Sequence, residues 1–127
     1  MKKVYSLFLI CGAIINILGG IFHFLFWYLF NWKATLASLD WMNRNIMLML
    51  NYCLGAFFFL LGILLIVLRK EVLTSLLGKA LLLTLSIVYA IRLVFEIILP
   101  GTSCFWSVFL IVIICLFLFP TLSVKNN

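Results

Sequence analysis

Charged residues are scarce in this chain, because lysine, arginine, aspartate and glutamate together make up only 9% of its 127 residues. Soluble domains carry roughly 25% charged residues, so this scarcity excludes an ordinary soluble domain. Hydrophobic residues account for 68% of the chain, and a folded protein of this size cannot hide so much apolar surface from water. The composition therefore indicates a protein whose natural solvent is lipid.

Residues that build reactive centres are also few. A single histidine and three acidic residues do not favour a metal centre, which needs several such ligands. The cysteines lack the Cys-x-x-Cys spacing of a dithiol site. The four cysteines are Cys11, Cys53, Cys104 and Cys115. We expect at least three of these four to be packed as small apolar side chains. No phosphate-binding glycine loop or Gly-x-Ser-x-Gly motif is present, and whether the protein uses a cofactor is unknown from the sequence.

Four long apolar runs predict an all-α integral membrane protein. A transmembrane helix needs about 20 apolar residues, and the alternating pattern of membrane β-strands is absent. The predicted helices cover about residues 4–30, 46–68, 72–99 and 105–124. We expect one domain over residues 1–127, a bundle of four antiparallel transmembrane helices. The first helix is expected to stay uncleaved, because no small-residue cleavage site follows it.

Basic residues in the short connections predict the orientation. In a protein with four spans, six basic residues lie on the same side as the termini: Lys2, Lys3, Arg69, Lys70, Lys79 and Lys125. Two basic residues, Lys33 and Arg44, lie on the other side. The positive-inside rule then places both termini in the cytoplasm and residues 31–45 and 100–104 outside. The positive charge thus indicates topology and not nucleic-acid binding. Residues 69–71 are predicted to form a tight turn between helices two and three.

The outer connection, "NWKATLASLDWMNRN", is too polar to span a membrane and too apolar for a plain linker. Its apolar residues recur at helical spacing, which predicts a short amphipathic helix lying at the membrane interface. Trp32 and Trp41 would anchor it, and with Arg44 they would form a cap over the outer mouth of the bundle. An interfacial loop that only anchors the chain is the alternative.

Polar side chains from three predicted helices reach the same depth below the outer surface. At 1.5 Å per residue, His23 and Arg92 lie roughly 10 Å deep. Asn51 lies roughly 8 Å deep and Glu96 roughly 5 Å deep. Glycines at helical spacing share the faces of His23 and Asn51, which is typical of faces that pack against other helices. Facing lipid would instead cost a charge roughly 2.5–3.5 kcal/mol, so we expect these residues to face inward.

Arg92 and Glu96 are one helical turn apart and can form an ion pair. Helix stability does not explain the pair, because the reverse order is the favourable one and the helix dipole opposes a negative charge in the last turn. Two interpretations stay open: an ion pair that locks the helices, or a site that binds a ligand or relays protons. His23 has the same two interpretations, since Glu96, Asn51 or a backbone carbonyl could hold it.

Three stretches, "GGIFHFLFWYLFNWKATLASL", "NRNIMLMLN" and "YAIRLVFEI", resemble a group of small four-helix membrane proteins from bacteria whose function is not established. The resemblance implies a location in the bacterial inner membrane. It singles out His23, Trp32, Arg44, Asn51 and Arg92. Similar sequences are expected to carry another histidine where Asn51 stands, and this departure argues against a two-histidine metal or haem site. The DoxX-like proteins share only the size and layout of this chain.

The leading functional hypothesis is a polar pocket in the outer half of the bundle, which binds a small polar or anionic ligand such as a lipid headgroup or a quinone. Arg92 would fix the anion, and His23 and Asn51 would donate hydrogen bonds. The full set of candidate ligand-binding residues is His23, Asn51, Tyr89, Arg92 and Glu96. The alternative is a structural accessory subunit that joins a membrane protein partner or a second copy of the chain. A third hypothesis is an enzyme or proton relay that uses His23 and Glu96.

Overall fold

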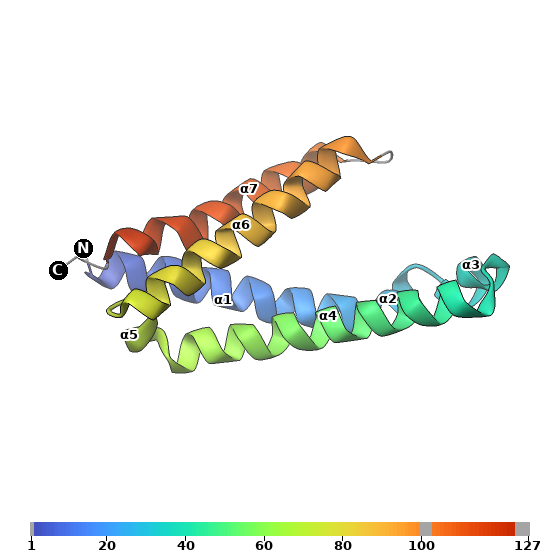
Figure 1. Cartoon of the computed structure of the whole chain (residues 1–127), viewed down its shortest axis with the longest axis horizontal. Helices are drawn as coiled ribbons and strands as arrows, with labels where there is room; N and C mark the ends of the chain where they lie inside the picture. Colours follow the sequence, from blue (N-terminus) through green and yellow to red (C-terminus); the bar gives the residue numbers. More distant parts are fainter. Residues whose placement is uncertain (1, 100–102, 124–127) are drawn as a thin grey trace. The chain divides into compact units, whose positions relative to one another are not determined.

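A computed structural model of the chain describes residues 2–99 and 103–123, and these are helical almost throughout (Figure 1). The described residues form no strand. The elements are α1 (Lys2–Phe24), α2 (Phe26–Leu29), α3 (Trp32–Thr35), the 3-10 helix η1 (Leu36–Ser38), α4 (Trp41–Val67), α5 (Arg69–Val72), α6 (Leu76–Ile98), α7 (Cys104–Leu118) and the 3-10 helix η2 (Phe119–Ser123). The all-α prediction is confirmed.

Within residues 2–99 and 103–123, four helical segments are long and apolar enough to cross a membrane: Lys3–Phe24, Trp41–Val67, Leu76–Ile98 and Cys104–Leu122. They indicate a multi-pass membrane protein. The chain divides into two compact units, Ala13–Leu64 and Met1–Gly12 together with Leu65–Asn127. The single domain and the antiparallel order of all four helices stay predictions.

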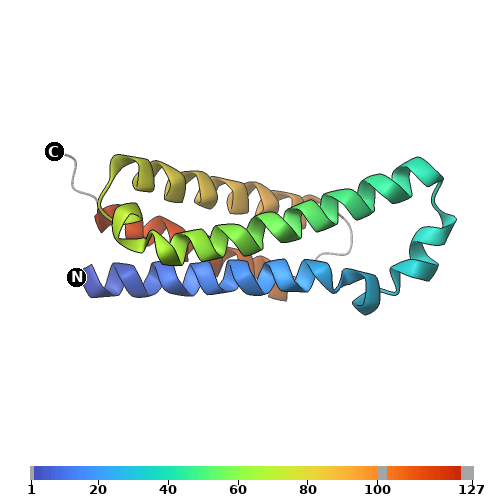
Figure 2. The same ribbon diagram turned by 90° about the horizontal axis from the view of Figure 1, so that it is seen from below.

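Within the unit Ala13–Leu64, glycines bring the backbones of α1 and α4 close together (Figure 2). A Cβ atom added to Gly20 would lie 2.6 Å from the carbonyl oxygen of Gly55, and one added to Gly62 would lie 2.6 Å from that of Ala13. Rising numbers on α1 meet falling numbers on α4, so these stretches run antiparallel. Small residues permit this approach in membrane bundles.

The first predicted helix, residues 4–30, is interrupted at Leu25. The N–H of Leu25 is shared between the carbonyl oxygens of Ile21, at 3.2 Å, and Phe22, at 3.1 Å. The four-residue helix α2 follows, and Asn31 then adopts the left-handed conformation, with φ 46° and ψ 47°. Asparagine tolerates this conformation better than most residues. The prediction of one unbroken helix is therefore wrong over its last turns.

The prediction of a single amphipathic helix between α2 and α4 is not confirmed. The chain makes two short elements, α3 and η1, and α4 begins at residue 41 rather than at 46. Trp32 lies on α3, whereas Trp41 and Arg44 belong to the start of α4. Leu36 of η1 is buried, but Trp41 is exposed. The three residues of the expected cap thus lie on two separate helices.

Asp40 explains the early start of α4. Its carboxylate accepts a hydrogen bond of 3.0 Å from the backbone N–H of Asn43 and another from the side-chain amide of Asn43. The first of these is the bond of a helix N-cap. Both bonds lower the pKa of the Asp40 carboxyl, because they stabilise its charged form. The helix therefore extends beyond the apolar run into polar sequence.

We expect the first turn of α4 to open at acidic pH. Since the pKa of Asp40 is lowered in the folded state, its stabilisation is fully present above the unfolded value and is lost as pH falls through the lower folded value. Hydrogen-exchange protection of the Asn43 and Arg44 amides, corrected for intrinsic exchange, measures this opening. Asp40→Asn is the matched control, because it keeps an accepting oxygen that does not titrate. The same pH dependence in both proteins would assign the effect to another group.

In the other unit, the predicted boundaries of helix three change. Residues 69–71 belong to the short helix α5 rather than to a tight turn, and α6 begins at Leu76 rather than at residue 72. Ser75 caps α6, because its hydroxyl oxygen accepts a hydrogen bond of 2.9 Å from the N–H of Gly78. The tight-turn prediction is therefore wrong. The predicted outer connection, residues 100–104, and Lys125 lie largely or wholly outside the described residues.

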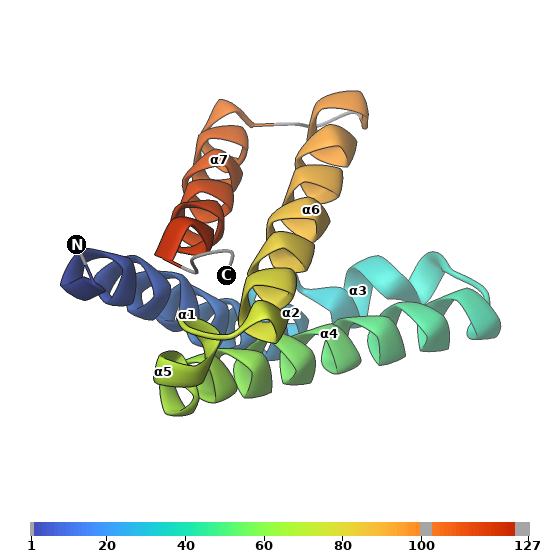
Figure 3. The same cartoon turned by 60° about the vertical axis from the view of Figure 1, so that its left-hand side comes forward.

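Helix α7 runs back alongside α6 (Figures 1 and 3). Tyr89 of α6 stacks on Phe117 of α7, with ring centroids 5.9 Å apart and an interplanar angle of 14°. Pro120 has no N–H to donate to the preceding turn, and the chain continues beyond Leu118 as the 3-10 helix η2. The α-helix predicted to residue 124 thus ends earlier.

The cysteines are not packed as expected. All four side chains are exposed: Cys11, Cys53, Cys104 and Cys115. The prediction that at least three of them are packed is therefore wrong. A small apolar thiol is also compatible with a helix surface that faces lipid, and composition does not distinguish the two environments.

Candidate functional site

Four of the five candidate ligand-binding residues are buried or half-buried, and one is an exception. Asn51 and Glu96 are each only 8% exposed, and Tyr89 is buried as well. His23 is half-buried. Arg92 is the exception, because 55% of its side-chain surface is exposed. The spacing of polar residues along the helices therefore predicted most of the buried positions, but it did not predict the exposure of the Arg92 side chain.

Asn51 of α4 holds His23 of α1 at two points. Its side-chain nitrogen donates a hydrogen bond of 2.7 Å to the backbone carbonyl of His23. Its side-chain oxygen lies 2.7 Å from Nδ1 of the same histidine. Gly55, one turn along α4, faces the Cβ of His23 and leaves room for α1 to come this close. The two bonds join two predicted membrane spans.

These two bonds also determine which ring nitrogen of His23 carries a proton. A backbone carbonyl can only accept, so the nitrogen of the Asn51 amide must face it and the oxygen must face Nδ1. Nδ1 therefore carries the proton and donates to Asn51. Nε2 of the neutral ring is left with a lone pair. It can accept a hydrogen bond, or donate one after the ring takes up a second proton.

Nε2 of His23 is accessible. No described residue forms a hydrogen bond with Nε2. Every buried side-chain nitrogen or oxygen atom of the described residues does have a hydrogen-bond partner. Nε2 is therefore not one of the buried atoms. The imidazole stacks on Phe26, with centroids 4.6 Å apart, and lies 5.7 Å from the ring of Phe58. Trp32 in turn meets Phe26 edge-on at 5.5 Å. A hydrogen-bond acceptor thus lies among aromatic rings.

Arg92 and Glu96 form the ion pair that their spacing predicted. Nη2 of Arg92 lies 2.5 Å from Oε2 of Glu96, and the Glu96 side chain is 9% exposed. A guanidinium has five N–H donors, and one carboxylate does not use all of them. Arg92 therefore neutralises a nearly buried carboxylate while its remaining donors are available to an anion. Planar guanidinium groups bind carboxylate and phosphate well.

The structure brings the candidate residues together in two pairs, His23 with Asn51 and Arg92 with Glu96. Each pair lies within one of the two units. Asn51 has a structural role as well, because its oxygen and one of its N–H groups are used by His23. Asn51 therefore orients the imidazole, and its role as a donor to a ligand, through its second N–H group, stays a prediction.

Sequence reasoning missed the aromatic partners of His23. Phe26 follows His23 by three residues, a helical spacing that could have suggested the stacking. Phe58 comes from another helix, and the sequence carries no signal for that contact. The bond from Asn51 to the backbone carbonyl of His23 also has no specific sequence signal, because every residue carries such an acceptor.

Comparison with protein-family models, with curated proteins and with solved structures finds no match to this chain. The resemblance to small bacterial four-helix membrane proteins therefore stays a prediction.

Proposed function

We propose that this is a multi-pass protein of the bacterial inner membrane that binds a small polar or anionic ligand, such as a lipid headgroup or a quinone. One observation carries the proposal: Asn51 occupies Nδ1 and the carbonyl of His23, while Nε2 stays accessible. A polar atom without a partner in hydrocarbon carries a free-energy cost. A ligand hydroxyl at Nε2 would supply the missing bond.

Arg92 supplies the positive charge in this proposal. More than half of its side-chain surface is exposed, although the guanidinium is paired with Glu96. The depth argument from the sequence supports one ligand for both residues, since His23 and Arg92 are predicted roughly 10 Å below the outer surface. Within the proposed antiparallel bundle, with cytoplasmic termini, the ligand lies in the outer half. Tyr89 would line the site, and the residues from Trp32 to Arg44 would cover it.

The double variant Arg92→Gln/Glu96→Gln is expected to lose the ligand but keep the fold. It removes both charges together, because Arg92→Gln alone would leave a nearly buried carboxylate unpaired at considerable cost. Small molecules that co-purify with the detergent-solubilised protein are identified by mass spectrometry, and thermal unfolding is measured on the same samples. A wild-type protein without any bound small molecule, or equal ligand content in the double variant, would contradict the proposal.

A structural accessory subunit is the second candidate function. The specific observation in its favour is that both bonds between Asn51 and His23 join α1 to α4, so these polar groups can act as locks alone. The same double variant separates the two functions for the ion pair of Arg92 and Glu96, and it leaves the bonds between Asn51 and His23 in place. A lock formed by Arg92 and Glu96 predicts a lower unfolding temperature at unchanged small-molecule content. The enzyme or proton relay that uses His23 and Glu96 stays a prediction.

A further inference from the structure

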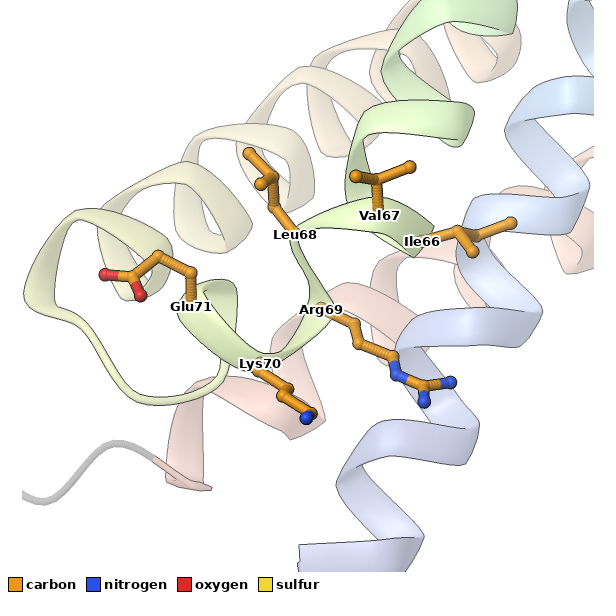
Figure 4. A pocket seen from close by; sticks show the side chains of 6 residues that line it. All are labelled: Ile66, Val67, Leu68, Arg69, Lys70 and Glu71. Carbon is orange, nitrogen blue, oxygen red and sulfur yellow. The ribbon is translucent and has the colours of Figure 1, made fainter.

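An open depression lies where the second predicted span ends (Figure 4). Its volume is about 480 Å³, which is within the range of roughly 300–1,000 Å³ that ligand sites occupy. It is lined by the last residues of that span and by α5: Ile66, Val67, Leu68, Arg69, Lys70 and Glu71. None of these residues belongs to the candidate site described above.

The lining of the depression is amphiphilic. Residues 66–68 are apolar, whereas the next three residues carry two positive charges and one negative charge. Arg69 and Lys70 are exposed, and in the described part of the chain neither forms an ion pair. Figure 4 shows the side chain of Glu71 extending away from that of Arg69. The basic groups are therefore not neutralised by their acidic neighbour.

The charge balance favours an anion. The lining has a net charge of +1, from two basic side chains and one acidic side chain. The carboxyl end of α4 opposes an anion with roughly half a negative charge, which is less than the net positive charge of the lining. Guanidinium and ammonium groups are the usual partners of phosphate in proteins.

The position of the depression indicates how the anion is presented. Val67 ends the apolar span Trp41–Val67, and the end of such a span marks the boundary between hydrocarbon and headgroups. A ligand at this boundary can place apolar groups against residues 66–68 and a phosphate against the basic pair. An anionic phospholipid has both parts in this order.

We propose that this depression binds an anionic phospholipid, with Arg69 and Lys70 at its phosphate and residues 66–68 against its glycerol and upper acyl chain. The proposal is independent of the ligand assigned to His23 and Arg92. A basic residue at a membrane surface contributes roughly 5-fold to the affinity for anionic lipid. The variant Arg69→Gln/Lys70→Gln is therefore expected to bind phosphatidylglycerol roughly 25-fold more weakly.

The test titrates the detergent-solubilised full chain with short-chain phosphatidylglycerol or phosphatidylcholine and measures the bound lipid by native mass spectrometry. Phosphatidylglycerol should bind more tightly. Lys70→Gln should weaken its binding roughly 5-fold, whereas Lys33→Gln, which removes another exposed lysine side chain elsewhere, should leave it unchanged. Glycerol phosphate, which lacks acyl chains, should compete only weakly.

Three results would overturn the proposal: equal affinity for the two lipids, equal loss in Lys70→Gln and Lys33→Gln, or full competition by glycerol phosphate. The last would indicate a site for free phosphate. Glu71→Gln keeps both basic residues and provides a test even if the double variant does not fold. It should tighten binding of phosphatidylglycerol, and unchanged or weaker binding would contradict the charge argument.

Discussion

Gly20→Ala is expected to destabilise the protein by roughly 1–3 kcal/mol, the usual cost of placing extra atoms in a packed interior. The new Cβ would lie 2.6 Å from the carbonyl oxygen of Gly55 and 2.7 Å from the backbone nitrogen of Phe59. Both are backbone atoms of α4, so no side-chain rotation can relieve the overlap. Either α1 and α4 separate, or one of them bends.

Gly19→Ala is the matched control for this substitution. A Cβ at Gly19 meets nothing within 4 Å, and alanine has a higher helix propensity than glycine by roughly 1 kcal/mol. Gly19→Ala should therefore be neutral or stabilising in the same unfolding measurement in detergent. Equal effects at the two positions would show that close contact between α1 and α4 is not what requires glycine at position 20.

Asn51→Leu is expected to cost roughly 1–3 kcal/mol, because it leaves Nδ1 and the carbonyl of His23 without their partner. It should also release the tautomer of His23. In the wild-type protein, nitrogen NMR should show that the neutral imidazole carries its proton on Nδ1 and none on Nε2. In the variant the ring should no longer be restricted to that form, while the rest of the spectrum remains that of a folded helical protein.

Asn45→Leu tests whether these effects come from the contact rather than from the substitution itself. Asn45 lies on the same helix and is exposed, so its replacement should change neither stability nor the histidine signals. If the His23 resonances of Asn51→Leu matched those of the wild type, the assignment of the proton to Nδ1 would be wrong.

The four spans could be predicted from the sequence, but their ends could not. The length of an apolar run indicates how much helix lies in hydrocarbon, and it says nothing about helix that continues into polar sequence. Asp40 starts α4 ahead of its apolar run. Residues 69–71 look like a turn because they are charged, yet arginine, lysine and glutamate are good helix formers. The interruption at Leu25 could not be predicted, because no proline or glycine stands next to this residue.

The candidate site was predictable where its contacts are local. Arg92 and Glu96 are four residues apart on one helix, and their ion pair followed from that spacing. The pairing of His23 with Asn51 joins residues 28 positions apart, so the sequence could offer it only as one of several options. Composition also does not predict which side chains of an apolar helix are exposed, as the four exposed cysteines show.

The spanning helices differ in length, and this difference has a consequence in a bilayer. The 27 residues of α4 extend about 40 Å, whereas the 15 residues of α7 extend about 22 Å. The hydrocarbon layer is about 30 Å thick, and the five residues of η2 add about 10 Å to α7. A thicker membrane would merely cover more of α4, but it would exceed the reach of α7. Hydrophobic mismatch therefore acts on the last span before it acts on the second.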